Sequence, residues 1–181
     1  AGDDGDYCVG DALGGNPTAS GGSGGYSYSW SNFQLSDVNN SNPTLTGSTT
    51  GSFTYNLTVT DANNCVGTDA VVVTVYENPV ANAGDDGDYC VGATIGGSPA
   101  ASGGGGNYTY SWSPGGGLSD ATIGNPVLTT SATNMTYELT VSDGNQCSSV
   151  SSVPVTVTEN PTVDAGDDGD YCVGDALGGN P

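Results

Sequence analysis

The chain of 181 residues contains no lysine, no arginine and no histidine, against twenty aspartate and glutamate residues. No two side chains can therefore form a salt bridge, and each carboxylate must be met by water, a backbone N–H group or a cation from solution. The formal net charge of −20 disfavours nucleic acids and anionic lipid surfaces as partners. We predict no nucleic-acid partner and no direct insertion into a membrane.

The same absences weigh against catalysis. General bases, activated nucleophiles and oxyanion-stabilising groups commonly draw on His, Lys or Arg. Two carboxylates alone can hydrolyse a glycoside, but they need a cleft that separates their pKa values. The acidic residues here gather instead in short glycine-bearing segments, so we predict that the protein is not an enzyme.

An internal repeat is the strongest signal that the sequence does contain. The segment AGDDG begins at Ala1, Ala83 and Ala165, which gives a period of 82 residues (83 − 1 and 165 − 83). Residues 165–181 are identical to residues 1–17, so we expect the chain to be a stretch of a longer array. The period divides the chain into two full modules and the start of a third: 1–82, 83–164 and 165–181.

Each module is predicted to be all-β. In YSYSW, Tyr26, Tyr28 and Trp30 alternate with serine and share one face of a strand. The same alternation continues in the next apolar run, at Phe53, Tyr55, Leu57 and Val59, and the run AVVVTVY follows it. Short strands divided by Gly, Ser and Pro clusters, with Trp in a middle strand, are typical of a two-sheet sandwich. A core role is favoured for the aromatic residues, and a sugar-stacking platform is the alternative.

These stretches also carry a family resemblance. AGDDGDYCVG, YSYSWS, FTYNLTVTDANNC and VVVTV resemble the PKD-like, immunoglobulin-type repeats of very large surface proteins of Bacteroidota, including gliding-motility adhesins. The resemblance covers both modules and the terminal fragment. It implies tandem immunoglobulin-like (PKD-like) β-sandwich domains in an extracellular protein, either at the cell surface or in a secreted filament.

The five cysteines predict disulfides in an oxidising compartment. Cys8 and Cys65 are 57 residues apart (65 − 8), and Cys90 and Cys147 are again 57 apart (147 − 90). The simplest pairing is one bond per module, Cys8–Cys65 and Cys90–Cys147, which leaves Cys172 unpaired within the chain. A bond between Cys65 and Cys90 across the junction is the alternative, because spacing alone does not fix connectivity.

The acidic segments suggest a divalent cation. Each DDGD copy stands where one module gives way to the next, and Ca²⁺ prefers several oxygen ligands in flexible geometry. The alternative is a solvated turn whose Asp side chains cap backbone N–H groups. The candidate Ca²⁺ ligands are these: Asp3, Asp4, Asp6, Asp61, Glu77, Asp85, Asp86, Asp88, Asp143, Glu159, Asp167, Asp168 and Asp170.

The sequence therefore predicts a structural repeat of an extracellular filament, stalk or adhesin, stapled by disulfides, stiffened by calcium, and partnered by neighbouring repeats or copies of itself. The alternative is a ligand-binding adhesin module that recognises carbohydrate or a mineral or ice surface. Donation of the 17-residue tail to a neighbouring subunit is disfavoured, because the tail would compete with the identical residues 1–17. Surface glycans are further candidates, because four N-x-S/T sequons begin at Asn39, Asn56, Asn107 and Asn134.

Overall fold

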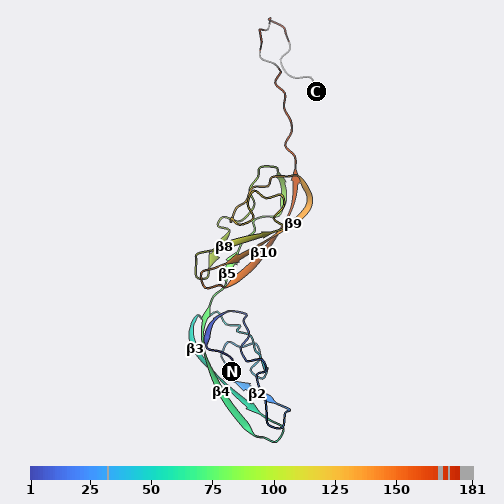
Figure 1. Cartoon of the computed structure of the whole chain (residues 1–181). Coiled ribbons are helices and arrows are strands. Elements are labelled where there is room, and N and C mark those ends of the chain that lie inside the picture. Colours follow the sequence, from blue (N-terminus) through green and yellow to red (C-terminus); the bar gives the residue numbers. More distant parts are fainter. Residues whose placement is uncertain (32, 167–168, 171, 176–181) are drawn as a thin grey trace.

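A computed structural model describes residues 1–31, 33–166, 169–170 and 172–175. Two similar β-rich units lie end to end, and the segment after the second unit runs away from it (Figure 1). The first unit contains β1 (Gly5–Cys8), β2 (Ser27–Trp30), β3 (Gly51–Thr60) and β4 (Val66–Tyr76). The second contains β5 (Pro79–Ala81), β6 (Gly87–Cys90), β7 (Ala101–Gly103), β8 (Thr109–Ser113), β9 (Ala132–Ser142) and β10 (Ser148–Thr158).

The main sheet has the same topology in both units. Its strand order is β1-β4-β3-β2 in the first unit and β6-β10-β9-β8 in the second. The short first strand of each sheet runs parallel to its neighbour, β1 beside β4 and β6 beside β10, and the other pairs are antiparallel. Because β1 and β4 run the same way, Cys8 lies beside Tyr76, at the end of the unit where β4 finishes.

The layer opposite each main sheet is made of loops and short pairings. Isolated bridges join Ala12 to Thr44 and Leu35 to Leu45 in the first unit, and the second unit repeats them. There the small antiparallel sheet of β5 and β7 adds to the same layer. The described residues contain strands and no helix, so the prediction of an all-β sandwich is confirmed.

The alternating residues form a separate core in each unit. Trp30 and Trp112 are 3% exposed, and each indole Nε1 donates a 2.9 Å hydrogen bond to a backbone carbonyl, of Asn40 and Ile123 respectively. Tyr55 and Leu57 are buried on the same face, as the alternation predicted. Trp30 therefore belongs to the core, and a sugar-stacking platform with Trp30 at its centre is wrong. Tyr26 and Tyr28 are half-buried.

The connection between the units is short. Only Glu77 and Asn78 separate β4 from β5, and β5 already pairs with β7 of the second unit. The structured part of the second unit thus begins before Ala83, while the 82-residue period itself stays a prediction of the sequence. Within the described part of the chain, no helix has the length and apolar character needed to cross a bilayer.

Candidate functional site

A disulfide joins the two units across their junction. Cys8 at the end of β1 is bonded to Cys147, with their Cα atoms 5.5 Å apart and a sequence separation of 139 residues. Cys65, Cys90 and Cys172 are free and exposed. The predicted pairs Cys8–Cys65 and Cys90–Cys147 are therefore wrong, and so is the alternative pair Cys65–Cys90.

The direction of β1 explains why the predicted pairing fails. Cys65 stands just before β4, whereas Cys8 lies beside Tyr76 at the other end of the same strand. β4 has 11 residues, which at about 3.3 Å per residue places its two ends more than roughly 30 Å apart. A disulfide needs Cα atoms within about 7 Å. Cys147 precedes β10 at the end of the second unit that faces the first, so it meets this requirement.

Hydrogen bonds fix the link beside this disulfide. The Asn78 side-chain amide donates to the carbonyl oxygen of Val9 at 2.9 Å. The backbone N–H of Ala81 then donates to Ser149 Oγ at 2.9 Å, which holds β5 against β10. The segment after the second unit repeats the first contact, because the amide of Asn160 donates to the carbonyl of Val91 at 2.9 Å. The motif Glu-Asn-Pro, present at 77–79 and 159–161, is the sequence signal that could have identified this link.

The carboxylate of Asp61 organises the loop between β3 and β4. It accepts hydrogen bonds from the backbone N–H groups of Ser23, Asn63 and Cys65 at 2.9–3.0 Å, and from Ser23 Oγ at 2.7 Å. These bonds, those from Ser23 first, lower the pKa of Asp61 from 3.8 to about 2. Asp61 therefore caps the loop, because its carboxylate oxygens accept hydrogen bonds from backbone N–H groups.

Asp143 has the corresponding role at the junction. Its carboxylate accepts from the backbone N–H groups of Gly105, Asn145 and Cys147, at 2.6, 2.9 and 3.0 Å. It is the buried charged side chain among the described residues, at 7% exposure. Asp143 thus positions the loop that presents Cys147 to Cys8.

The first two DDGD segments lie beside the sheets, away from the junction where the sequence order had placed them. Asp4 Oδ1 accepts a 2.8 Å hydrogen bond from the N–H of Val72, in the middle of β4. The corresponding position of β10 is Pro154 (72 + 82), which has no N–H to donate. Asp4 therefore caps a backbone N–H group, as the alternative interpretation of DDGD predicted. Its counterpart Asp86 is an exposed side chain.

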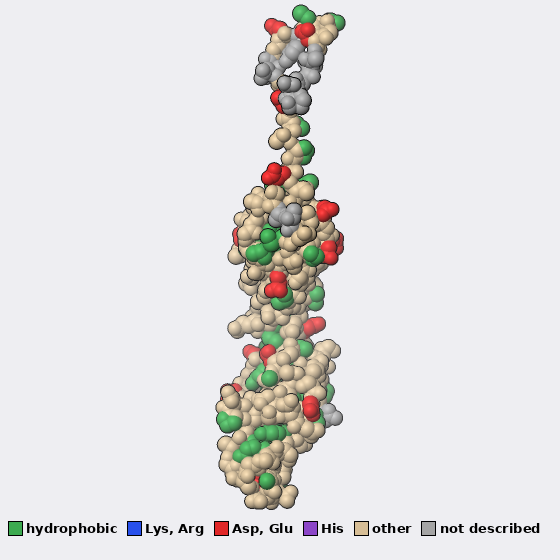
Figure 2. Space-filling model, turned by 90° about the vertical axis from the view of Figure 1, so that its right-hand side faces the viewer, with side chains coloured by type: hydrophobic (Ala, Val, Ile, Leu, Met, Phe, Trp, Pro, Cys, Tyr) green, Lys and Arg blue, Asp and Glu red, His purple; other side chains and the backbone are tan. Residues whose placement is uncertain are grey.

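The described candidate ligands do not assemble into a cation site. Among the residues that the structure describes, no three His, Cys, Asp or Glu side chains gather around a common point. Acidic side chains are scattered over the face shown in Figure 2. Glu159 accepts a 3.2 Å hydrogen bond from Ser131 Oγ. The other candidate ligands that the structure describes are exposed: Asp3, Asp6, Glu77, Asp85, Asp88 and Asp170. Asp167 and Asp168 lie outside the described residues.

The four sequon asparagines are all exposed. Asn39 and Asn107 lie in loops, and Asn56 and Asn134 lie in β3 and β9 with their side chains at the surface. Their modification by glycans stays a prediction.

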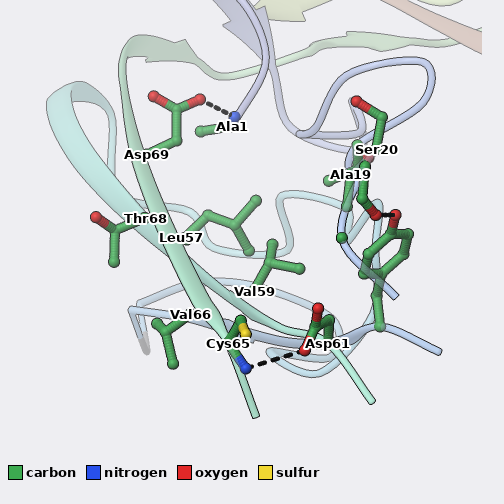
Figure 3. Close-up of a pocket in the computed structure, with 15 residues that line it drawn as sticks. Ala1, Ala19, Ser20, Leu57, Val59, Asp61, Cys65, Val66, Thr68 and Asp69 are labelled. Carbon is green, nitrogen blue, oxygen red and sulfur yellow. Dashed lines mark hydrogen bonds and ion pairs between the residues drawn. The ribbon is translucent and has the colours of Figure 1, made fainter. Parts of the chain in front are cut away.

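A groove on the first unit was not anticipated from the sequence. It encloses about 360 Å³ between Thr18–Gly22 on one side and Cys65–Asp69 on the other, with Leu57 and Val59 between them (Figure 3). At one end the ammonium group of Ala1 pairs with Asp69. Asp61 lies at the other end, beside Cys65.

Comparison with protein families finds a PKD-type match in the first unit. The sequence profile of the K319L-like PKD domain family matches residues 13–75. No curated protein matches the chain.

Similar solved structures include extracellular domains 1–4 of protocadherin gamma B7, the I67–I69 fragment of titin and domains EC22–24 of mouse cadherin-23. Their sequence identities are 15%, 12% and 14%, and their TM-scores are 0.37, 0.33 and 0.37. The matches cover 88%, 87% and 88% of this chain. They span 50%, 63% and 63% of the solved chains, so this chain is shorter than each of them.

Proposed function

We propose that this chain is a structural part of an extracellular filament, stalk or adhesin, in which sandwich units are locked end to end. The observation that carries the proposal is the Cys8–Cys147 bond, because it connects two units that have separate cores. A chain whose units only needed to fold would gain more from a staple within each unit. A bond between units instead restricts how one unit moves against the next.

Two connections at one interface explain how the junction resists bending. The chain itself crosses at Glu77 and Asn78, and the disulfide crosses a second time from Cys8. A single flexible link leaves neighbouring domains free to reorient. A second covalent connection removes most of that freedom, and the Asn78–Val9 hydrogen bond fixes the link between them.

The proposal is tested by measuring the spread of inter-unit orientations, with small-angle scattering and residual dipolar couplings. We expect the double variant Cys8→Ser/Cys147→Ser to broaden the distribution while each unit stays folded. The matched control Cys65→Ser/Cys90→Ser removes two exposed thiols and should leave the distribution unchanged. Equal orientational spread in the wild type and in the Cys8/Cys147 variant would overturn the proposal.

We further propose that the chain binds Ca²⁺, because its side chains carry only negative charge. Twenty carboxylates without a Lys, Arg or His leave the array dependent on cations from solution. We expect chelation of calcium at constant ionic strength to lower the thermal unfolding midpoint of the oxidised chain. An unchanged midpoint would remove calcium from the proposal and leave the disulfide-locked array in place.

A further inference from the structure

The covalent route along the two units is much shorter than the chain itself. β1 ends at Cys8 beside the junction, and its disulfide partner Cys147 directly precedes β10. β10 then continues from the junction to the far end of the second unit, where the chain leaves it (Figure 1). β1, the disulfide and β10 therefore form one continuous line through both units.

The residues between the two cysteines lie outside this line. The bond closes residues 9–146 into a loop, and the Cα atoms of the two cysteines that close it are 5.5 Å apart. This closed loop contains β2, β3 and β4 of the first unit and β5 to β9 of the second, and with them most of both cores. Tension applied before Cys8 and after Cys147 thus has a covalent path that bypasses the closed loop.

We infer that β1, the Cys8–Cys147 bond and β10 carry axial tension in series, so that the closed loop of residues 9–146 stays folded and unloaded until the bond is reduced. The oxidised units then resist extension, and reduction places the closed loop in the load path. The inference rests on the proposed structural role in an array. It concerns tension along the array, whereas the proposed function concerns bending at the junction.

The two strands on the path have little length left to give. A β-strand already rises about 3.3 Å per residue, against a limit of about 3.6 Å for a fully extended chain. β1 has 4 residues and β10 has 11, so stretching these 15 residues (4 + 11) by about 0.3 Å each adds only about 5 Å. The ladders that join β1 to β4 and β10 to β9 therefore stay nearly in register under load.

The closed loop holds far more length. Cys8 and Cys147 are separated by 139 residues in sequence, which a fully extended chain spans over about 460–500 Å at 3.3–3.6 Å per residue. After reduction the load must pass through the link at Glu77 and Asn78, and so through both cores. Reduction of one bond thus converts an inextensible pair of units into an extensible one.

The covalent step is thiol–disulfide exchange with a dithiol such as dithiothreitol. One thiolate of the reductant bonds to the sulfur of Cys8 and releases Cys147 as a thiolate, which takes up a proton. The second thiolate of the same molecule then displaces Cys8 and closes a cyclic disulfide. Both cysteines are reduced to thiols, and one molecule of the reductant is oxidised.

Constant-force stretching of the full chain, held by handles at its two ends, tests the inference. Cys65→Ser, Cys90→Ser and Cys172→Ser leave Cys8 and Cys147 as the remaining cysteines of the five. The force is set so that the matched variant, which also carries Cys8→Ser and Cys147→Ser, unfolds within seconds. We expect that variant to lengthen in two steps, one for each core, that together give about 460–500 Å. The oxidised chain should show no such step at the same force.

Addition of dithiothreitol, at a concentration that fully reduces an unstretched sample by mass spectrometry, separates the outcomes. We expect the two unfolding steps to appear one after the other, with the waiting times of the matched variant, because forced unfolding follows the unfolding rate of each unit. A single step of about 460–500 Å would overturn the inference, since both cores would have unfolded inside the closed loop under load. No lengthening after reduction would overturn it as well.

Both of these outcomes leave the proposed function in place, because the bond between the units was present. Long steps before the reductant is added would show that the bond is absent, and they would overturn the proposed function together with the inference.

A second pulling geometry tests the path itself. In the same oxidised background, Asn63→Cys provides an exposed attachment point between β3 and β4, within the closed loop. Tension between this point and the C-terminal end must cross the fold of the first unit before it reaches Cys8. We expect lengthening without reductant, limited to about 200 Å by the 55 residues (63 − 8) between the two positions. Equal resistance in both geometries would contradict the series path.

Discussion

The side-chain amide of Asn78 donates a 2.9 Å hydrogen bond to the carbonyl of Val9, one residue after the disulfide-bonded Cys8. Asn78 belongs to the link and Val9 to the first unit, so this contact fixes the point where the chain departs. The link and the disulfide therefore form one mechanical feature. We therefore expect that loss of the hydrogen bond lets Cys8 and Cys147 move apart when they are reduced.

Asn78→Ala should weaken the internal disulfide. A hydrogen bond of this kind contributes about 1 kcal/mol, which corresponds to roughly fivefold in an equilibrium constant. We expect the equilibrium between reduced and oxidised Cys8–Cys147 to shift by that factor towards the dithiol, measured in glutathione buffers. Asn160→Ala removes the equivalent bond to Val91 outside the internal junction and serves as the control. An equal shift in both variants would contradict the coupling.

Reduction of the internal disulfide should lower stability. In the chain-entropy description, a cross-link that closes a loop of 139 residues contributes about 5 kcal/mol against complete unfolding. We expect the Cys8→Ser/Cys147→Ser variant to unfold at a clearly lower denaturant concentration than the Cys65→Ser/Cys90→Ser variant. Coincident unfolding curves would show that the bond constrains neither unit.

The alternation of residues within single strands allowed the fold to be predicted. The cysteine pairing depends instead on the direction of β1, which alternation does not reveal. Trp30, Tyr55 and Leu57 showed their buried face through alternation with polar residues. The parallel course of β1 beside β4 leaves no trace in alternation, because side chains alternate in the same way in either direction. Equal Cys spacings were consequently assigned to bonds within units, although the bond lies between them.

The acidic segments illustrate a second limit. Sequence order placed DDGD between modules, but β5 precedes it and already belongs to the second unit. The open groove was equally hidden, because the residues that line it, such as Ala19 and Val59, look like ordinary core positions.

Asp61 should make stability depend on pH at the acidic end. Its pKa is about 2 in the folded chain, below its usual 3.8, so its hydrogen bonds stabilise the fold fully above the unfolded value. That contribution is lost as the pH falls through about 2, where the folded carboxylate becomes protonated. We expect carboxyl NMR to show that the pKa of Asp61 is about 2, below the usual Asp value of 3.8.

Asp61→Asn provides the matched control for this pH dependence. The amide keeps an acceptor oxygen for the loop but cannot titrate, so the variant should lose the part of the acid transition that belongs to Asp61. Identical acid unfolding profiles for the variant and the wild type would contradict the assignment.

Two equivalent buried tyrosines should respond differently to loss of their hydroxyl groups. Tyr55 and Tyr137 are both 1% exposed, and burial raises the pKa of each. The Tyr137 hydroxyl donates a 3.2 Å hydrogen bond to the carbonyl of Gly116. Within the described part of the chain, the Tyr55 hydroxyl has no partner.

Tyr137→Phe should therefore destabilise the second unit by about 1 kcal/mol, whereas Tyr55→Phe should leave the first unit nearly unchanged or slightly stabilised. Hydrogen exchange resolves the effect by unit, because β9 reports on one tyrosine and β3 on the other. A loss of protection in β3 as large as that in β9 would show that Tyr55 does have a hydrogen-bond partner. Since the tyrosines are equivalent within the 82-residue repeat, the difference between them isolates the bond from the packing of the ring.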